Sequence, residues 1–293
     1  MAISKQDFEK LKELVRDICG INITDDKFMV IERKLESFLS IISSQNFNEF
    51  LEKLALPSGF LLREKLIDVI TTNETLFFRD VHPFETFSTI VIPRIEDLLK
   101  SRTDLSEGKF RIWSAGSSTG QEPYSIAMLL NEYSEKKKTL SPDKIEILAS
   151  DISSSVLSRA ISGQFNSSQI KRGLKPYFLD KYFQKSGNKW VIDEKIRNMV
   201  EFRRINLIDN FSILGKFDVV LCRNVLIYFD TQMRKNVLEK INRVLFDGGF
   251  LFVGASEIIM DFESQFSSER NGSTIFYRKK LSETDSHPAI QSL

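Results

Sequence analysis

The stretch Arg-Ile-Trp-Ser-Ala-Gly-Ser-Ser-Thr-Gly-Gln-Glu-Pro-Tyr-Ser-Ile-Ala-Met-Leu, residues 111–129, joins a short apolar strand to a helix through a turn of small residues. Gly116 and Gly120 let the backbone approach a ligand at points where a Cβ atom would clash. The free N–H groups at the start of the following helix point to the same place. The stretch therefore predicts a nucleotide-type binding turn.

The details of this turn narrow the class of ligand. Its Gly-x-x-x-Gly spacing differs from the Gly-x-Gly-x-x-Gly of dinucleotide-binding folds, which weakens an NAD interpretation. The second glycine is not followed by the Lys-Ser/Thr pair of a P-loop. Glu122 and Pro123 stand at the start of the helix instead, and a carboxylate there repels a triphosphate but suits a cationic ligand.

Outward from this turn, strands and helices alternate along residues 109–280. Apolar runs predict strands at 111–114, 145–150, 199–206, 217–222, 249–254 and 273–278, and helices at 122–138, about 153–162 and 231–245. Such alternation is typical of an α/β fold with a doubly wound, mostly parallel sheet. A segment at about 164–198 interrupts the alternation, and residues 189–193 within it predict a small antiparallel hairpin in an inserted β-subdomain.

The N-terminal part of the chain has a different pattern. Apolar residues recur at helical spacing through residues 4–70, which predicts a small all-α N-terminal domain over 1–80. A linker helix that begins at Pro83 is expected over 81–108. The polar residues 281–293 predict a flexible tail.

Composition excludes several classes of protein. The 293 residues carry a net charge of +1, so no global field demands nucleic acid or a membrane surface. The two cysteines are far apart and form no metal or redox spacing, and we expect no metal. No signal peptide or apolar run of about 20 residues is present, so we expect a cytoplasmic protein without membrane insertion. Residues 161–205 hold ten Lys and Arg against four Asp and Glu, which indicates either a solvated face or a surface that steers an acidic partner.

Polar residues follow several of the predicted strands. Gly116 and Gly120 follow the first strand, Asp151 ends the second, Asn206 ends the third, and the fourth is followed by Arg223, Asn224 and Tyr228. Ligands of open α/β sheets bind at the carboxyl ends of the strands, so these residues are expected in one cleft. An acidic side chain at the position of Asp151 commonly holds ribose hydroxyls, and the alternative is that it caps the next helix.

The chain resembles the CheR-type chemotaxis receptor methyltransferases over nearly its whole length. The resemblance rests on Thr71–Asp80 (Thr-Thr-Asn-Glu-Thr-Leu-Phe-Phe-Arg-Asp), Trp113–Met128, Ala149–Ile152, Cys222–Asp230 (Cys-Arg-Asn-Val-Leu-Ile-Tyr-Phe-Asp) and Gly254–Glu257, in that order. It implies a class I S-adenosylmethionine methyltransferase fold and S-adenosylmethionine as cofactor, with S-adenosylhomocysteine as product. It also implies esterification of chemoreceptor glutamates, with the cytoplasmic helices of chemoreceptors as partners. We expect a monomer.

The resemblance also implies roles for single residues. The implied cofactor-binding residues are Asn73, Thr75, Arg79, Ala115, Gly116, Glu122, Asp151, Asn206, Leu207, Asn224 and Val225. Among them, Glu122 faces the cationic methionyl end, Asp151 holds the ribose, and Asn206 flanks the adenine. Arg79 and Tyr228 are the implied catalytic residues, beside the reactive methyl group and the incoming carboxylate. Taken alone, Arg79 would suit a surface salt bridge, and Tyr228 a half-buried core aromatic.

Other functions stay open at this point. The chain could methylate another acidic protein or a small acid, or it could sense S-adenosylmethionine without turnover; a dinucleotide oxidoreductase is a distant third. Some family members tether a receptor's C-terminal pentapeptide through a glycine-containing loop, but the corresponding loop, residues 184–189, is short and holds one glycine. We therefore expect no strong tether, and we hypothesise that the basic segment 161–205 docks the substrate.

Overall fold

The computed structural model describes residues 4–41, 47–101, 109–138, 140–257, 259 and 262–281, so all but the first residue of the predicted tail lies outside the described residues. Its N-terminal part is helical, and its first helix has clear sequence signals at both ends. Ser4 accepts a hydrogen bond from the backbone of Asp7, and Gly20, at a φ of 75°, ends the helix. The elements are α1 (Lys5–Cys19), η1 (Asp25–Lys27), α2 (Phe28–Ile41), α3 (Phe47–Ala55), η2 (Pro57–Gly59) and α4 (Phe60–Ile70).

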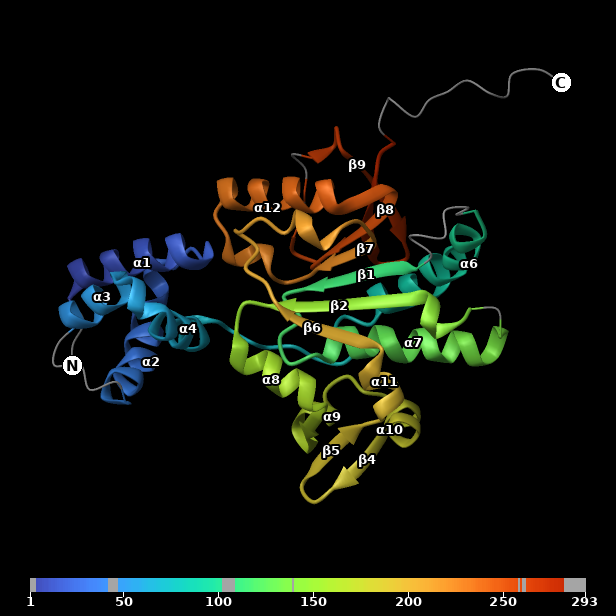
Figure 1. The fold of residues 1–293 in the computed structure, drawn as a ribbon, viewed down its shortest axis with the longest axis horizontal. Helices are drawn as coiled ribbons and strands as arrows, with labels where there is room; N and C mark the ends of the chain where they lie inside the picture. Colours follow the sequence, from blue (N-terminus) through green and yellow to red (C-terminus); the bar gives the residue numbers. More distant parts are fainter. Residues whose placement is uncertain are drawn as a thin grey trace.

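These helices have a hydrophobic core of their own. Leu11, Phe50, Leu54 and Leu66 are fully buried in it. In Figure 1 the helices form a group beside the sheet domain, to which the chain after α4 connects them. The prediction that the N-terminal region is all-α is therefore confirmed over its described residues.

The larger part of the chain contains a seven-stranded sheet. Its strands are β1 (Phe110–Ala115), β2 (Ile145–Asp151), β6 (Val200–Arg204), β7 (Phe217–Cys222), β8 (Leu245–Val253), β9 (Phe266–Asn271) and β10 (Thr274–Lys279). They lie in the order β6-β2-β1-β7-β8-β10-β9. The first five in this order pair in parallel, and β10 pairs antiparallel with both β8 and β9. The predicted mostly parallel, doubly wound sheet is confirmed, whereas β9 was not predicted.

Successive side chains of each central strand enter different cores, because side chains of a strand alternate between its faces. On β1, Ile112 packs into one core with α5 (His82–Thr86), the π-helical η3 (Phe87–Val91), α6 (Ile92–Ser101) and α7 (Gln121–Lys137). Its neighbour Trp113 packs into the other core with α12 (Thr231–Val244). The segment predicted as a linker helix, 81–108, thus packs on the sheet over its described residues, and the extended connection between the two cores is residues 71–76.

The remaining elements surround the sheet. They are η5 (Pro142–Lys144), α8 (Ser154–Ser162), η6 (Ser212–Leu214), η7 (Leu226–Tyr228) and the inserted β3 (Gln164–Asn166), α9 (Ser167–Lys171), α10 (Pro176–Tyr182), β4 (Phe183–Ser186), β5 (Lys189–Ile192) and α11 (Glu194–Asn198). The inserted strands form an antiparallel sheet in the order β3-β5-β4, which confirms the small β-subdomain. Phe165 and Phe183 pack against Phe77, which follows the connection 71–76.

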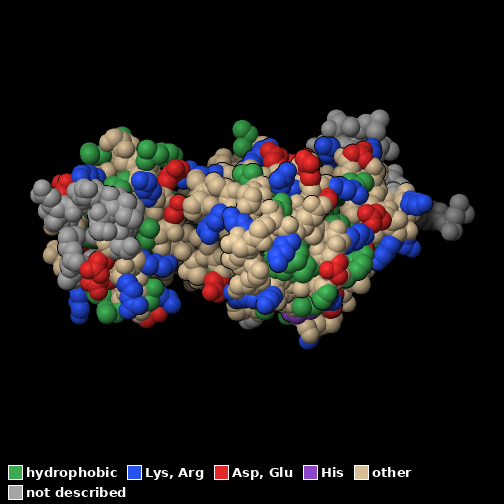
Figure 2. All heavy atoms as spheres, turned by 90° about the horizontal axis from the view of Figure 1, so that it is seen from below, with side chains coloured by type: hydrophobic (Ala, Val, Ile, Leu, Met, Phe, Trp, Pro, Cys, Tyr) green, Lys and Arg blue, Asp and Glu red, His purple; other side chains and the backbone are tan. Residues whose placement is uncertain are grey.

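A buried polar network fixes this subdomain to α7. The carboxylate of Glu132 accepts hydrogen bonds from Lys181 at 2.5 Å, Tyr182 at 2.6 Å and Tyr177 at 2.7 Å. These donors lower the pKa of Glu132 below its ordinary value, although burial by itself raises it. Figure 2 looks onto the molecule from below the view of Figure 1 and shows basic side chains scattered over this face rather than gathered in one cluster.

Candidate functional site

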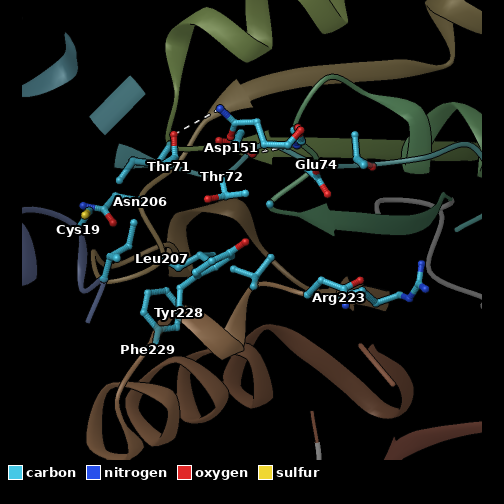
Figure 3. Close-up of a pocket in the computed structure, with 18 of the residues that line it drawn as sticks. Cys19, Thr71, Thr72, Glu74, Asp151, Asn206, Leu207, Arg223, Tyr228 and Phe229 are labelled. Atoms are coloured by element: carbon cyan, nitrogen blue, oxygen red, sulfur yellow. Dashed lines mark hydrogen bonds between the residues drawn. The ribbon is translucent and has the colours of Figure 1, made fainter. Parts of the chain in front are cut away.

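A deep cleft lies at the carboxyl ends of the central strands. It contains about 1040 Å³ of empty space, counting its open mouth, and residues of β1, β2 and β7 or of the loops after them line it. The chain order reverses between β1 and β7, and ligands of open α/β sheets bind at such a switch point. Figure 3 shows side chains from both parts of the chain around this cleft, among them Cys19, Asp151 and Tyr228.

The glycine turn forms one wall of the cleft. Gly116 has a φ of 75°, and a Cβ atom added to it would lie 2.3 Å from Cγ2 of Val225. Gly120 has a φ of 90° and precedes the first residue of α7. The backbone N–H groups of Gly116 and Ser117 both donate to the carbonyl of Ser150, which ties the turn to β2. Glycine is therefore required here by conformation and by space.

Asp151 lies at the end of β2 and is 7% exposed. Its Oδ2 accepts from the backbone of Ser118 at 2.8 Å, and its Oδ1 accepts from the backbone of Ser153 at 3.0 Å. Ser153 itself caps α8, because its hydroxyl accepts from the backbone of Val156. Asp151 is thus not the N-cap residue of that helix. Burial raises the pKa of Asp151 above its ordinary value, whereas the two backbone donors oppose the rise.

The connection between the domains closes one side of the cleft. Thr72, Asn73, Glu74 and Thr75 all line it, and the Asn73 carbonyl accepts from the hydroxyl of Ser118 at 2.9 Å. This bond joins the connection to the glycine turn. A ligand in the cleft is therefore enclosed by a segment that is not part of the sheet.

The N-terminal domain closes another side. Asn206 donates its side-chain amide to the carbonyl of Ile18 at 2.8 Å, and the backbone of Asn22 donates to the carbonyl of Tyr228 at 2.8 Å. Arg16 and Asp230 form an ion pair at 2.6 Å. Cys19, whose pKa burial raises to about 11, lines the cleft as a neutral thiol.

A buried arginine, Arg223, lines the cleft and bridges several acceptors. The side chain of Arg223 is 1% exposed and donates to Glu122 Oε2 and Asp80 Oδ2, each at 2.8 Å. It also donates to the carbonyl of Arg79 at 3.0 Å. Glu122 accepts a further hydrogen bond from Ser114 at 2.8 Å. Arg223 therefore holds the first turn of α7 and the segment around Arg79 in one place.

The backbone around Arg79 is strained. Phe78, Asp80 and Val81 have φ values of 50°, 69° and 55°. Positive φ is uncommon for residues other than glycine, and for a β-branched residue such as Val81 it is a genuine outlier. Strain of this kind persists where surrounding contacts fix it, often at functional sites. Here the backbone N–H of Phe78 donates to the hydroxyl of Ser125, and Arg223 holds the next two residues.

Tyr228 stands opposite this segment at the end of η7. Burial raises its pKa above the ordinary value, while the positive charge of Arg79 and a hydrogen bond with Thr72 lower it. The Tyr228 hydroxyl points toward Thr72 in Figure 3. Glu257 fixes the loop before Tyr228, because its carboxylate accepts from the backbone of Gly254 at 2.6 Å, Asn224 at 2.7 Å and Ile227 at 3.1 Å.

The cleft brings together nearly all the residues that the sequence predicted for the site. Those that line it are Asn73, Thr75, Arg79, Gly116, Glu122, Asp151, Asn206, Leu207, Asn224, Val225 and Tyr228. Two predicted residues do not line it: Ala115 is buried at the end of β1, and Gly120 lies at the start of α7. The roles of these residues toward a cofactor stay predictions. Arg223 also lines the cleft, where the strand order predicted it, although no role was predicted for it. Asp80 and Glu257 were not predicted for the site, although each lies within a quoted motif.

In the described part of the chain, no group of three or more His, Cys, Asp and Glu side chains could hold a metal ion. None of the helices in this part of the chain has the length and apolar character needed to cross a membrane.

Comparisons with known proteins identify relatives of this chain. Two family models match it: the all-alpha domain of CheR methyltransferases at residues 6–71, and their SAM binding domain at residues 73–275. A chemotaxis protein methyltransferase 1 of Pseudomonas aeruginosa is 36% identical over 281 residues, which are 96% of this chain and 100% of that protein. A chemotaxis protein methyltransferase Cher2 of Pseudomonas putida is 36% identical over 282 residues, again 96% and 100%. A chemotaxis protein methyltransferase of Borreliella burgdorferi is 38% identical over 260 residues, 88% and 89%.

Proposed function

The chain belongs to the CheR methyltransferase family, and we propose that it esterifies glutamate side chains of chemoreceptors. Membership makes it a methyltransferase with S-adenosylmethionine as cofactor, as the resemblance implied. The glutamate acceptor is the proposed part. A single observation supports it most: Arg79 and Tyr228, a guanidinium and a phenol, line the same cleft as the cofactor residues, next to a strained backbone.

The residues in the cleft fit this cofactor. When bound, S-adenosylmethionine supplies a methyl group on a positively charged sulfonium. The cleft is lined by three carboxylates, Glu74, Glu122 and Asp151, against two guanidiniums, so one negative charge remains to favour a cation. Among the described residues, nothing donates to the buried Oδ1 of Asn224, which leaves an acceptor for an ammonium group. The absence of a Cβ at Gly116 leaves room for Val225, another residue that lines the cleft.

We assign the enclosing residues by position. Asp151 would hold the ribose, and Asn206 with Leu207 would flank the adenine. Glu122 would face the methionyl end, with Asn224 and Val225 beside it. Asn73 and Thr75 would close the site from the connection between the domains.

The acceptor chemistry requires alignment rather than a base. A glutamate side chain has a pKa of about 4.3 and is already an anionic nucleophile at neutral pH. Arg79 can donate two parallel hydrogen bonds to such a carboxylate. Within the described part of the chain, its guanidinium donates to the carbonyl of Glu74 at 3.1 Å and keeps other N–H donors for a substrate. Placement of the reacting groups in near-attack geometry can supply roughly 7–11 kcal/mol of rate acceleration.

Tyr228 completes the alignment. Its raised pKa keeps the phenol protonated at neutral pH, so it acts as a hydrogen-bond donor or a packing surface rather than a base. Its backbone carbonyl accepts from Asn22 of the N-terminal domain. We therefore assign Arg79 and Tyr228 to the acceptor side of the reaction.

The test uses methyl-labelled S-adenosylmethionine with membranes that contain chemoreceptors. Base-labile label on receptor bands, lost in Arg79→Ala and reduced in Tyr228→Phe, is the expected result. Cofactor binding by calorimetry is measured in parallel on each variant. If labelled receptor does not form although the cofactor binds, the acceptor is another acidic protein or a small acid, or the chain senses the cofactor without turnover.

A further inference from the structure

The inserted subdomain is not needed to complete the central sheet. It occupies residues 164–198, between α8 and β6, and its three strands pair with one another in the order β3-β5-β4. The edge strand β6 pairs directly with β2. The subdomain nevertheless packs aromatic side chains against residues 77–78, which immediately precede the arginine assigned to the acceptor side.

Phe77 makes contacts with the subdomain through both its ring and its backbone. Its ring is fully buried, and its centroid lies 4.9 Å from that of Phe165 and 5.5 Å from that of Phe183, both in edge-to-face geometry. Gly173, in the turn between α9 and α10, has a φ of 93°, and a Cβ atom added to it would lie 2.0 Å from the carbonyl oxygen of Phe77. A side chain at position 173 would therefore displace the backbone two residues before Arg79.

Phe78 packs between the subdomain and a residue beneath Arg223. Its ring centroid lies 4.7 Å from that of Phe178 on α10 and 5.4 Å from that of Phe84 on α5. The guanidinium of Arg223 lies over the Phe84 ring at 5.5 Å and donates to the carbonyl of Arg79. A continuous series of contacts therefore leads from α10 to the backbone of Arg79.

The helix that carries Phe178 is itself fixed to α7. Tyr177, Lys181 and Tyr182 of α10 all donate to the buried carboxylate of Glu132 on α7. The ring of Phe178 stacks on that of Tyr182, with centroids 6.2 Å apart. Because α7 begins directly after the glycine turn of the cleft, the helix that starts at the cofactor site also determines where α10 lies.

The strained backbone explains why this packing matters for the site. Phe78 has a φ of 50°, and Asp80 and Val81 also have positive φ values. Such conformations persist only where the surrounding structure over-determines them. If the contacts of Phe178 were lost, this segment could relax, and the Arg79 side chain would then change its direction.

We propose that the inserted subdomain positions Arg79 for methyl transfer, and that Phe178 and Gly173 are positioning residues that act through residues 77–78. This inference rests on the proposed function, because it takes Arg79 as a residue of the acceptor side. The role differs from substrate docking by the basic segment 161–205. Positioning affects kcat with the receptor bound, whereas docking affects KM for the receptor.

The first experiment compares Gly173→Ala with Gly272→Ala. Both glycines are exposed and have positive φ, 93° and 57°, so alanine strains the backbone at both positions. Within the described part of the chain, a Cβ atom at Gly272 meets nothing within 4 Å. Gly173→Ala should lower kcat for receptor methylation about tenfold or more relative to Gly272→Ala, because a small displacement of a reacting group costs that much. The affinity for S-adenosylmethionine, measured by calorimetry, should be equal in the two variants.

The second experiment removes one ring contact from each domain. Phe178→Ala is compared with Phe28→Ala, because Phe28 is also partly buried and pairs with Phe8 at 4.8 Å in the N-terminal core. Circular dichroism establishes that both variants are folded. Phe178→Ala should lower kcat about tenfold or more and Phe28→Ala should not. Phe178→Leu should recover part of the rate, because it keeps most of the apolar volume.

The third measurement follows the backbone without relying on activity. The amide of Phe78 donates to the hydroxyl of Ser125 at 3.1 Å, and the amide of Val81 donates to the carbonyl of Phe78 at 2.8 Å. Hydrogen exchange at these two amides should become about tenfold faster or more in Gly173→Ala and Phe178→Ala, and should not change in the two control variants.

The outcomes separate this inference from the proposed function. Absence of receptor methylation by the wild type would refute the proposed function and, with it, this role of the subdomain. Methylation by the wild type with kcat values of Gly173→Ala and Phe178→Ala within about twofold of their controls would refute the positioning role alone. Unchanged amide exchange, or a loss confined to KM for the receptor, would refute it as well, and the latter result would assign the subdomain to docking.

Discussion

Replacement of Arg223 by methionine should uncouple cofactor binding from methyl transfer. Arg223→Met keeps the side-chain length but removes the hydrogen bonds to Glu122, Asp80 and the carbonyl of Arg79. Removal of one partner of a buried ion pair costs about 3–5 kcal/mol, because the remaining charges stay buried and unpaired. The Asp80 side chain is 34% exposed and can be hydrated in the variant, so we expect the free energy of unfolding to fall by about 3 kcal/mol.

The kinetic effect should be larger than the loss of cofactor affinity. Each strained residue beside Arg79 stores about 1–3 kcal/mol, and this segment relaxes when its anchor is removed. Relaxation moves the Arg79 guanidinium, and a displacement of about 1 Å at a reacting group costs about 100-fold in rate. We therefore expect kcat/KM for receptor to fall about 100-fold or more. Arg223→Lys should give an intermediate value, because an ammonium lacks the planar fork that bridges three acceptors.

The assay combines labelled methyl transfer, calorimetry with the cofactor, and urea unfolding. Lys53→Met is the control, because Lys53 lies outside the basic segment 161–205 and forms a surface pair with Glu49 at 2.6 Å, and such pairs contribute about 0–1 kcal/mol. If Arg223→Met kept kcat/KM within about threefold of the wild type, the view that Arg223 positions Arg79 would be wrong.

Three other perturbations test separate parts of the molecule. Gly116→Ala forces a Cβ atom to within 2.3 Å of Val225 at a φ of 75°, so cofactor affinity measured by calorimetry should fall about tenfold or more while circular dichroism stays unchanged. Glu132→Gln should lower the free energy of unfolding by about 1–3 kcal/mol at neutral pH. Because the folded-state pKa of Glu132 is depressed, its contribution is present above the ordinary pKa and is lost as pH falls through the folded value. Urea unfolding of the variant and the wild type should therefore converge only at a pH below the ordinary carboxyl pKa. If the difference in the free energy of unfolding between the variant and the wild type stayed constant with pH, an ionised Glu132 would not be its source. The basic segment 161–205 is tested by replacing Lys185, Lys189 and Lys195 together with glutamate. This change should weaken receptor methylation in a salt-dependent way and leave cofactor affinity unchanged. Equal loss of methylation and cofactor affinity, or loss of neither, would count against docking through the segment.

The central sheet could be predicted from the sequence because of where its strands lie. Parallel strands covered on both faces are rich in apolar residues, as in Phe217–Cys222, where every residue is buried and all but Asp218 are apolar. The glycine turn was predictable for a different reason, since its two glycines are required by backbone conformation. The strand β9 was missed because Phe266–Asn271 is mostly polar and exposed at the sheet edge. Its extended conformation is stabilised by antiparallel pairing with β10, which the residues of β9 alone do not indicate.

The ion pairs of Arg223 with Glu122 and Asp80 could not be predicted in the same way. Arg223, Glu122 and Asp80 come from three separate segments, and no local pattern shows that one guanidinium will bridge two carboxylates and a carbonyl. The strain at Phe78–Val81 is equally invisible in sequence, because none of these residues is a glycine. Periodicity predicts elements, whereas the pairing of charges between elements depends on the packed structure.

The two domains form the cleft together, and this has a consequence for catalysis. Tyr228 is fixed on one side by Glu257 through the backbone of its loop, and on the other by Asn22 through its own carbonyl. The connection 71–76, which Ser118 binds through Asn73, lies across the same space. The cost of ordering these side chains is therefore met when the domains dock during folding, not at each turnover. Alignment is the main requirement of the proposed glutamate esterification, because its nucleophile is already ionised, and a cleft wall that is ordered in advance would favour it.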